Sequence, residues 1–216
     1  EGLADTVAAI AESRDGLLWF TTPDGLVRYD GERFETLIED LPPGPKLGLV
    51  EDQRGQLWVT SGQTLCRIQG DRFEEFSVPD DIRGPWYLTD LFEDRAGRLW
   101  MPQGGAPLLS FDGETFEAHT TKDGLVNYQV NGLFEDRDGQ LWVACWGGLS
   151  RFDGGRFTVF TAESGLGSNG VMTVMEDAHG VIWAGTWNGL SNYRDGRMTL
   201  VSDHNVRDLM VDDQGR

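Results

Sequence analysis

Three histidines and two cysteines are the residues in this 216-residue chain whose types could support metal binding or nucleophilic catalysis. His119 is expected on an outer strand, His179 in a hairpin turn and His204 in a linker, so no two of them share a plausible metal or acid–base cluster. Cys66 and Cys145 fall at dissimilar places in the chain, and both are expected to be free thiols. The sequence therefore predicts no catalytic residue, no metal and no cofactor in this segment.

A second set of residues combines aromatic rings with amide and cationic side chains in segments that we expect to be loops. Flat rings cover the C–H faces of a polyhydroxylated ligand while amides bond its hydroxyls, so a saccharide fits this chemistry. The predicted ligand-binding residues are Arg83, Trp86, Tyr87, Tyr128, Trp146, Trp187, Asn188 and His204. Two alternatives stay open: linker amides can serve backbone groups, and the tryptophans can contact a partner protein.

Five copies of one repeat must position these residues. Each copy carries a polar turn that ends in glycine, a Leu-Trp or Ile-Trp step, and a second turn before a closing aromatic or methionine; the copies begin at Glu12, Glu51, Glu93, Glu135 and Glu176. Their tryptophans recur about 40 residues apart, as in repeats that each form one four-stranded propeller blade. A ring at this place fills the space between blades, so the predicted structural core comprises Trp19, Trp58, Trp100, Trp142 and Trp183.

Short runs of alternating, β-branched and aromatic residues separate the turns, and no run has helical spacing over a helical length. The sequence predicts an all-β propeller of four-stranded antiparallel blades, with five complete repeats and the first strand of a sixth, in one domain over residues 1–216. The blades are expected at 7–37, 47–76, 88–120, 130–161 and 171–201, with a partial blade at 206–216. In the fourth copy the expected strands are 130–135, 140–145, 149–152 and 156–161.

An aspartate begins the first turn of most copies, and its side chain is expected to cap the turn while glycine takes the positive φ. These aspartates are Asp52, Asp94, Asp136, Asp177 and Asp212. The extra strand at 206–211 has no vacancy in a five-bladed ring, so we expect the chain to be part of a larger ring. We also expect self-association, or pairing with missing blades, through the open ends.

The chain carries 36 acidic and 18 basic residues, a formal net charge of -18. Such a surface repels phosphate backbones, which argues against a nucleic-acid partner, and it also promotes solubility. No apolar run approaches the ~18 residues that span a bilayer, so this segment is expected to make no membrane contact. No signal peptide opens the sequence, which is expected to be a mature domain or an excised part of one.

The pattern Asp-x-x-Gly-x-Leu-Trp followed by Gly-Leu-x-Arg-aromatic-Asp-Gly resembles the two-component regulator propeller repeat. That repeat occurs in the extracytoplasmic sensor region of bacterial hybrid histidine kinases and some diguanylate cyclases, and the linkers at 123–130 and 164–171 also look like the family's. The resemblance implies a periplasmic or extracytoplasmic, ligand-binding sensor domain in signal transduction. Any kinase or cyclase activity would then belong to another part of the protein.

The second and third units depart from the repeat through prolines in their linkers and through the added Trp86 and Tyr87, so specificity could reside there. Three functions remain open from the sequence. A ligand-sensing module is the first, and a protein-interaction propeller is the second. A lyase similar to streptogramin lyase is the weakest, because no catalytic constellation accompanies the fold.

Overall fold

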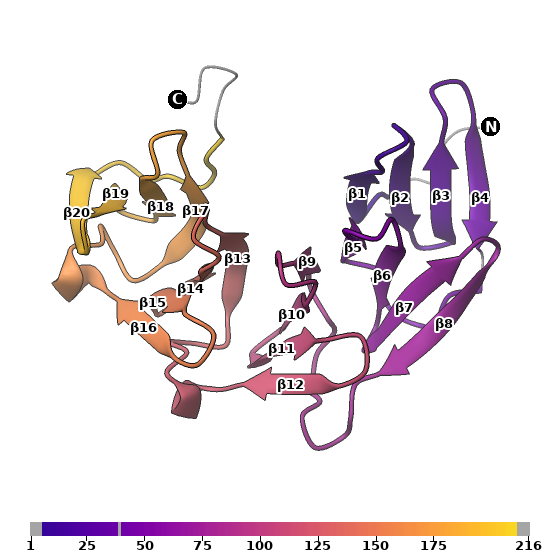
Figure 1. Ribbon diagram of the computed structural model, residues 1–216, viewed down its shortest axis with the longest axis horizontal. Coiled ribbons are helices and arrows are strands. Elements are labelled where there is room, and N and C mark those ends of the chain that lie inside the picture. The colour runs from indigo at the N-terminus through magenta and orange to yellow at the C-terminus, as the bar shows by residue number, and fades with distance from the viewer. Residues whose placement is uncertain (1–5, 39, 211–216) are drawn as a thin grey trace. The chain divides into compact units, whose positions relative to one another are not determined.

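The computed structural model describes residues 6–38 and 40–210 of the chain. Strands dominate this part, and they form five sheets of four consecutive antiparallel strands each (Figure 1). The predicted all-β fold is therefore confirmed. Two 3-10 helices, η1 (Thr121–Asp123) and η2 (Ala162–Ser164), lie in the linkers before the fourth and fifth sheets.

The chain divides into two compact units, residues 1–118 and 119–216. The first unit contains the first three sheets. The first sheet comprises β1 (Ala9–Glu12), β2 (Leu18–Thr22), β3 (Gly25–Tyr29) and β4 (Phe34–Ile38), and the second comprises β5 (Leu49–Glu51), β6 (Leu57–Ser61), β7 (Thr64–Gln69) and β8 (Arg72–Ser77). The third comprises β9 (Phe92–Glu93), β10 (Leu99–Gln103), β11 (Ala106–Phe111) and β12 (Phe116–His119), whose last residue belongs to the second unit. The second unit contains the other two: β13 (Val130–Glu135), β14 (Leu141–Cys145), β15 (Gly148–Phe152) and β16 (Phe157–Phe160); β17 (Val171–Glu176), β18 (Ile182–Thr186), β19 (Gly189–Arg194) and β20 (Arg197–Ser202).

One aspartate builds the turn between the first and second strands in four of the five sheets. In the fourth sheet, Asp136 Oδ1 accepts the N–H groups of Asp138 and Gln140 at 3.0 and 2.9 Å, and Gly139 closes the turn with a φ of 77°. Asp136 Oδ2 accepts the indole N–H of Trp142 at 2.7 Å. The same indole bond recurs at 2.8 Å from Trp58 to Asp52, from Trp100 to Asp94 and from Trp183 to Asp177. The predicted turn capping is confirmed for these four, and Asp212 lies outside the described residues.

The first repeat has Ser13 in place of this aspartate. The Ser13 hydroxyl oxygen accepts the indole N–H of Trp19 at 3.0 Å and donates to Asp15 Oδ1 at 2.5 Å. Asp15 also accepts the N–H of Leu17 at 3.4 Å. A serine and an aspartate two residues later thus replace the single carboxylate of the other repeats.

The glutamate before the turn aspartate joins neighbouring sheets. Glu176, at the end of β17, accepts the backbone N–H of Arg137 at 2.8 Å and forms an ion pair with the Arg137 side chain. The Arg137 guanidinium also donates to the carbonyl of Asp177 at 2.9 Å. In the first unit the same backbone bond joins Arg14 to Glu51 at 2.7 Å and Gln53 to Glu93 at 2.9 Å. The aspartate of the pair therefore closes its own turn, while the glutamate holds the preceding sheet.

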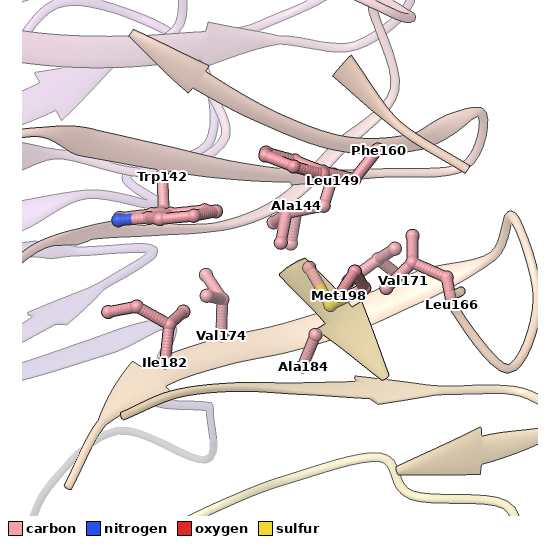
Figure 2. Close-up of a cluster of buried hydrophobic side chains, with 10 residues drawn as sticks. All are labelled: Trp142, Ala144, Leu149, Phe160, Leu166, Val171, Val174, Ile182, Ala184 and Met198. Atoms are coloured by element: carbon pink, nitrogen blue, oxygen red, sulfur yellow. The ribbon is translucent and has the colours of Figure 1, made fainter. Parts of the chain in front are cut away.

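Apolar side chains fill the space between the fourth and fifth sheets (Figure 2). The cluster comprises Trp142, Ala144, Leu149, Phe160, Leu166, Val171, Val174, Ile182, Ala184 and Met198. The Trp142 indole stacks on Phe160 with ring centroids 5.7 Å apart and meets Tyr193 edge-on at 5.2 Å. Figure 2 shows this indole facing Val174 and Ile182 of the next sheet. Of the five repeat tryptophans, Trp58, Trp100 and Trp142 are buried, and Trp19 and Trp183 are half-buried.

The segment that follows β20 was expected to hold a sixth first strand from residue 206. Residues 203–210 carry no assigned strand, and Val211 lies outside the described residues. The Val206 N–H donates to the carbonyl of Thr186 at 2.9 Å, so the segment passes the end of β18. This contact brings the next residue, Arg207, to the turn that follows β18.

Candidate ligand-binding site

Two of the predicted binding residues lie together in the second unit. Trp146 occupies the turn between β14 and β15, and Trp187 occupies the equivalent turn between β18 and β19. Their ring centroids are 5.8 Å apart and the ring planes meet at 37°. The side chains remain 45% and 38% exposed. Because adjacent sheets present equivalent turns at the same end, the two indoles form one exposed aromatic surface, which we call the indole pair.

Backbone contacts with the preceding linkers hold the indole pair. The N–H of Trp146 donates to the carbonyl of Gln129, and the N–H of Trp187 donates to that of Gly170, both at 3.1 Å. A Cβ atom at Gly170 would come within 2.7 Å of Trp187 Cδ1. The ring therefore lies directly on the linker backbone, and only glycine leaves room for it.

Arg207 also belongs to this surface, although the sequence analysis did not select it. Its guanidinium carbon lies 5.3 Å from the centroid of the Trp187 ring, within cation–π range. The neighbouring Asn205 side chain donates to the Trp187 carbonyl at 3.0 Å, which fixes the segment beside the turn. The repeat alignment contains a signal that could have pointed to Arg207. In that alignment Arg207 occupies the position of Asn131 in the fourth repeat, near the start of a first strand.

The other predicted residues of the second unit are more dispersed. Asn188 is exposed and directly follows Trp187. His204 is 87% exposed, and its Nδ1 lies 3.0 Å from the hydroxyl of Ser202. Tyr128 is half-buried, with its hydroxyl 3.4 Å from the backbone nitrogen of Thr121. Within the described part of the chain, none of these three side chains forms a hydrogen bond or ring contact with the indole pair.

The remaining predicted residues lie in one linker of the first unit. Arg83 is directed back into this linker, where it donates to the carbonyl of Val78 and pairs with Asp80 at 3.0 Å. Trp86 and Tyr87 are 62% and 47% exposed. The linker backbone is held by two amide side chains: Gln63 donates to the carbonyls of Gly84 and Trp86, and the buried Gln103 accepts from Gly84 and donates to Ile82.

Grooves between sheets lie at the opposite turns, where first strands meet second strands. One of about 530 Å³ separates the second and third sheets, and one of about 380 Å³ separates the fourth and fifth. Both are lined at the same repeat positions, by Asp52, Trp58 and Arg67 in the first unit and by Asp136, Trp142 and Arg151 in the second. Because the same repeat positions line both grooves, the grooves result from the way neighbouring sheets pack. We therefore do not place the ligand-binding site in them.

Two of the sequence's candidate reactive residue types, histidine and cysteine, form no group that could hold a metal ion among the described residues. His119 is buried against Phe152 and Phe157, with ring centroids 5.4 and 6.0 Å away. Cys66 and Cys145 are free and buried, and burial raises the pKa of each thiol to about 12. The described part of the chain holds no group of three metal-ligating side chains of the His, Cys, Asp or Glu type.

Comparison with known families identifies two of the repeats. Residues 124–147 and 165–188 match the family model described as "Two component regulator propeller". The resemblance drawn from the sequence is confirmed, and the two matched stretches contain Trp146 and Trp187. No curated protein sequence matches the chain.

Solved structures share the fold at low sequence identity. The extracellular domain of the hybrid two-component system BT3049 from B. thetaiotaomicron is 19% identical with a TM-score of 0.73, over 99% of this chain and 32% of that one. That of the one-component system BT4673 from the same organism is 20% identical with a TM-score of 0.73, over 97% and 30%. An inactive H270A virginiamycin B lyase from Staphylococcus aureus, crystallised with quinupristin, is 18% identical with a TM-score of 0.68, over 93% and 71%.

The chain thus spans about a third of the length of the two extracellular sensor domains. The likeness confirms the propeller fold and places two-component sensor propellers among its relatives in structure. Among the described residues, no helix has the length and apolar character needed to cross a membrane.

Proposed function

We propose that this chain is a ligand-sensing β-propeller module of a bacterial signal-transduction receptor, located in the periplasm or outside the cell. Its ligand is a saccharide or another small polar molecule that binds at the indole pair. The exposed and fixed Trp146–Trp187 surface is the observation that carries this proposal. The extracellular sensor domains of similar fold support the assignment to signalling and to an extracytoplasmic location.

The indole pair suits a sugar because two rings inclined at 37° present apolar faces in two directions. One pyranose can lie on each ring, with its C–H groups against the indole, while exposed amides supply hydrogen bonds to hydroxyls. Asn188 is next to the second ring in the chain. Since backbone bonds already fix both turns, binding loses little conformational entropy in the protein.

The test is a glycan-array screen with the whole chain, followed by calorimetry on the best ligand. Trp146→Ala and Trp187→Ala should each weaken binding while the melting temperature stays close to that of the native chain, because a ring lost from a turn opens no core cavity. Trp142→Ala provides the contrast, since loss of this buried ring should cost roughly 3–5 kcal/mol of stability. Unchanged affinity in both turn variants would refute a binding role for the indole pair.

A protein-interaction propeller is the second candidate, favoured by the linker that displays Trp86 and Tyr87. Two amide side chains hold its backbone while these two aromatic side chains stay exposed, as expected for an anchor at a protein interface. In that case the glycan array should give no ligand, and Trp86→Ala, rather than Trp146→Ala, should abolish capture of a partner protein. Catalysis of the lyase type has support only from the shared fold.

A further inference from the structure

Arg207 differs from the five arginines that form ion pairs, and also from Arg151, which lies over the Trp142 ring but donates to the Tyr193 hydroxyl at 2.9 Å. Five arginines form ion pairs with carboxylates: Arg28 with Glu35, Arg67 with Glu74, Arg83 with Asp80, Arg98 with Asp94 and Arg137 with Glu176. Arg207 is exposed and has no ion pair with any carboxylate in the described part of the chain, although acidic residues outnumber basic ones two to one. Its described contact is with the Trp187 ring, at 5.3 Å. The adjacent Asp208 carboxylate accepts the N–H of Leu209 at 2.9 Å.

The contact with the ring leaves the arginine able to bind an anion. An indole ring has no lone-pair acceptor for the guanidinium, so this contact leaves the five N–H donors available. Those donors match the two oxygens of a carboxylate or sulfate, which they can bind as a bidentate pair. The indole beneath holds the group in place, so less side-chain entropy is lost when the anion binds.

The net charge of the chain does not oppose such a contact strongly. At physiological ionic strength the Debye length is about 8 Å, so acidic groups farther away than this are largely screened. A ligand anion on the guanidinium is in direct contact with a positive charge. The Asp208 carboxylate is nearby, but it accepts the Leu209 N–H and forms no ion pair with Arg207. The local charges of this segment, rather than the overall charge, therefore decide which ligands this surface accepts.

We propose, resting on the proposed function, that the ligand of the indole pair is an anionic saccharide. Its sugar rings lie on the part of the indole pair that Arg207 leaves exposed, and its carboxylate or sulfate is bound by Arg207. A neutral saccharide of the same shape makes the stacking contacts alone and binds more weakly. This selects acidic glycans, made of uronic acids or of sulfated sugars, over neutral ones.

The experiment uses matched pairs of oligosaccharides that differ only in charge, with the whole chain and calorimetry as the readout. Oligogalacturonate, oligomannuronate and oligoglucuronate are each compared with their methyl esters, and sulfated glycosaminoglycan fragments with their desulfated forms. At least one acidic member should bind about tenfold or more tightly than its neutral partner. Comparison of the uronate pairs with the sulfated pairs shows whether the site binds a carboxylate or a sulfate.

Three variants connect that preference to the arginine. Arg207→Gln should remove the difference between acidic and neutral members while neutral binding is kept, and Arg207→Lys should restore only part of it, because an ammonium cannot stack or bind in bidentate fashion. Arg197→Gln removes the same charge from an exposed position on β20, in the sheet that carries Trp187, and should preserve the preference. Thermal melting of each variant confirms that the fold is intact.

The outcomes separate this inference from the proposed function. Equal binding of acidic and neutral members, or a preference that survives Arg207→Gln, overturns the anionic ligand and leaves saccharide binding in place. Absence of binding by every saccharide overturns this inference and the saccharide ligand of the proposed function, and leaves only another small polar ligand for the indole pair. A preference for acidic members that disappears in Arg207→Gln and persists in Arg197→Gln supports the proposal.

Discussion

Replacement of Asp136 tests how one carboxylate specifies a whole repeat. Its two oxygens accept three hydrogen bonds, from the N–H groups of Asp138 and Gln140 and from the indole of Trp142. Asp136→Ala removes all three. Water can reach the turn N–H groups, but the Trp142 ring is fully buried and its N–H is left without an acceptor.

The magnitude follows from these three contacts. A hydrogen bond to a charged group contributes about 1.5–3 kcal/mol, and an unsatisfied buried donor costs about 1–3 kcal/mol. With the turn N–H groups resolvated, Asp136→Ala should lower the free energy of unfolding by about 3–4 kcal/mol. Urea titration followed by tryptophan fluorescence measures this loss as a lower midpoint at an unchanged slope.

The first repeat supplies a matched control. It carries Ser13-Arg14-Asp15-Gly16 where the fourth carries Asp136-Arg137-Asp138-Gly139, so Asp136→Ser reproduces a turn that the chain already contains. Its hydroxyl should accept the Trp142 indole N–H as Ser13 accepts that of Trp19, and the loss should be only about 1–2 kcal/mol. A loss below about 1 kcal/mol for Asp136→Ala, or an equal loss for both variants, would refute the reasoning.

Three other features of the second unit yield predictions. In a double-mutant cycle, Glu176→Gln and Arg137→Gln should show a coupling energy of about 1 kcal/mol, since Arg137 is half exposed. If the stability losses of the two single variants simply add in the double variant, this ion pair does not help to join the sheets. Burial raises the pKa of Asp177, but the hydrogen bonds it accepts outweigh burial and hold this pKa below its ordinary value. The resulting stabilisation is complete above about pH 4 and is lost as the pH falls through the lowered pKa, so urea midpoints should drop more on acidification for the native chain than for Asp177→Asn. Gly170→Ala should displace the Trp187 ring and weaken ligand binding at least as much as Trp187→Ala, and unchanged affinity in calorimetry would show that the ring position is not needed.

The strands were predictable because short-range features specify them. Strand β13 coincides with the prediction at residues 130–135. Strand β16 is shorter than the predicted 156–161, because the N–H of Arg156 donates to Asp153 in the preceding turn and the N–H of Thr161 donates to the Ser164 hydroxyl of η2. Side-chain hydrogen bonds at both ends competed with the sheet, and the hydrophobic pattern alone did not reveal them.

The candidate site was only partly predictable. Trp146 and Trp187 each stand four residues after a repeat tryptophan, so the sequence placed both in equivalent turns and their proximity followed. Arg207 was overlooked because residues 206–211 have the apolar pattern of a first strand, whereas the structure assigns no strand to residues 206–210. The carboxylate–indole bond was also missed, since a turn signature identifies the capping aspartate but not the direction of its second oxygen.

The turns at the two ends of the sheets differ in how freely their residues vary from one repeat to the next. The turns between first and second strands keep a serine or aspartate and a glycine in every described repeat, because those residues bind the buried indole and close the turn. At the other end, the residue four places after the repeat tryptophan is Pro23, Gly62, Gly104, Trp146 or Trp187. In the third repeat, where this residue is Gly104, the side chain of Trp86 from the linker packs on it, 3.1 Å from where a Cβ would stand. An indole therefore lies at this turn in three repeats. In two of them it belongs to the turn residue itself, Trp146 or Trp187, and in the third it belongs to Trp86 of the linker. The same turn forms at Gly62 without any ring, so the turn itself does not require an indole.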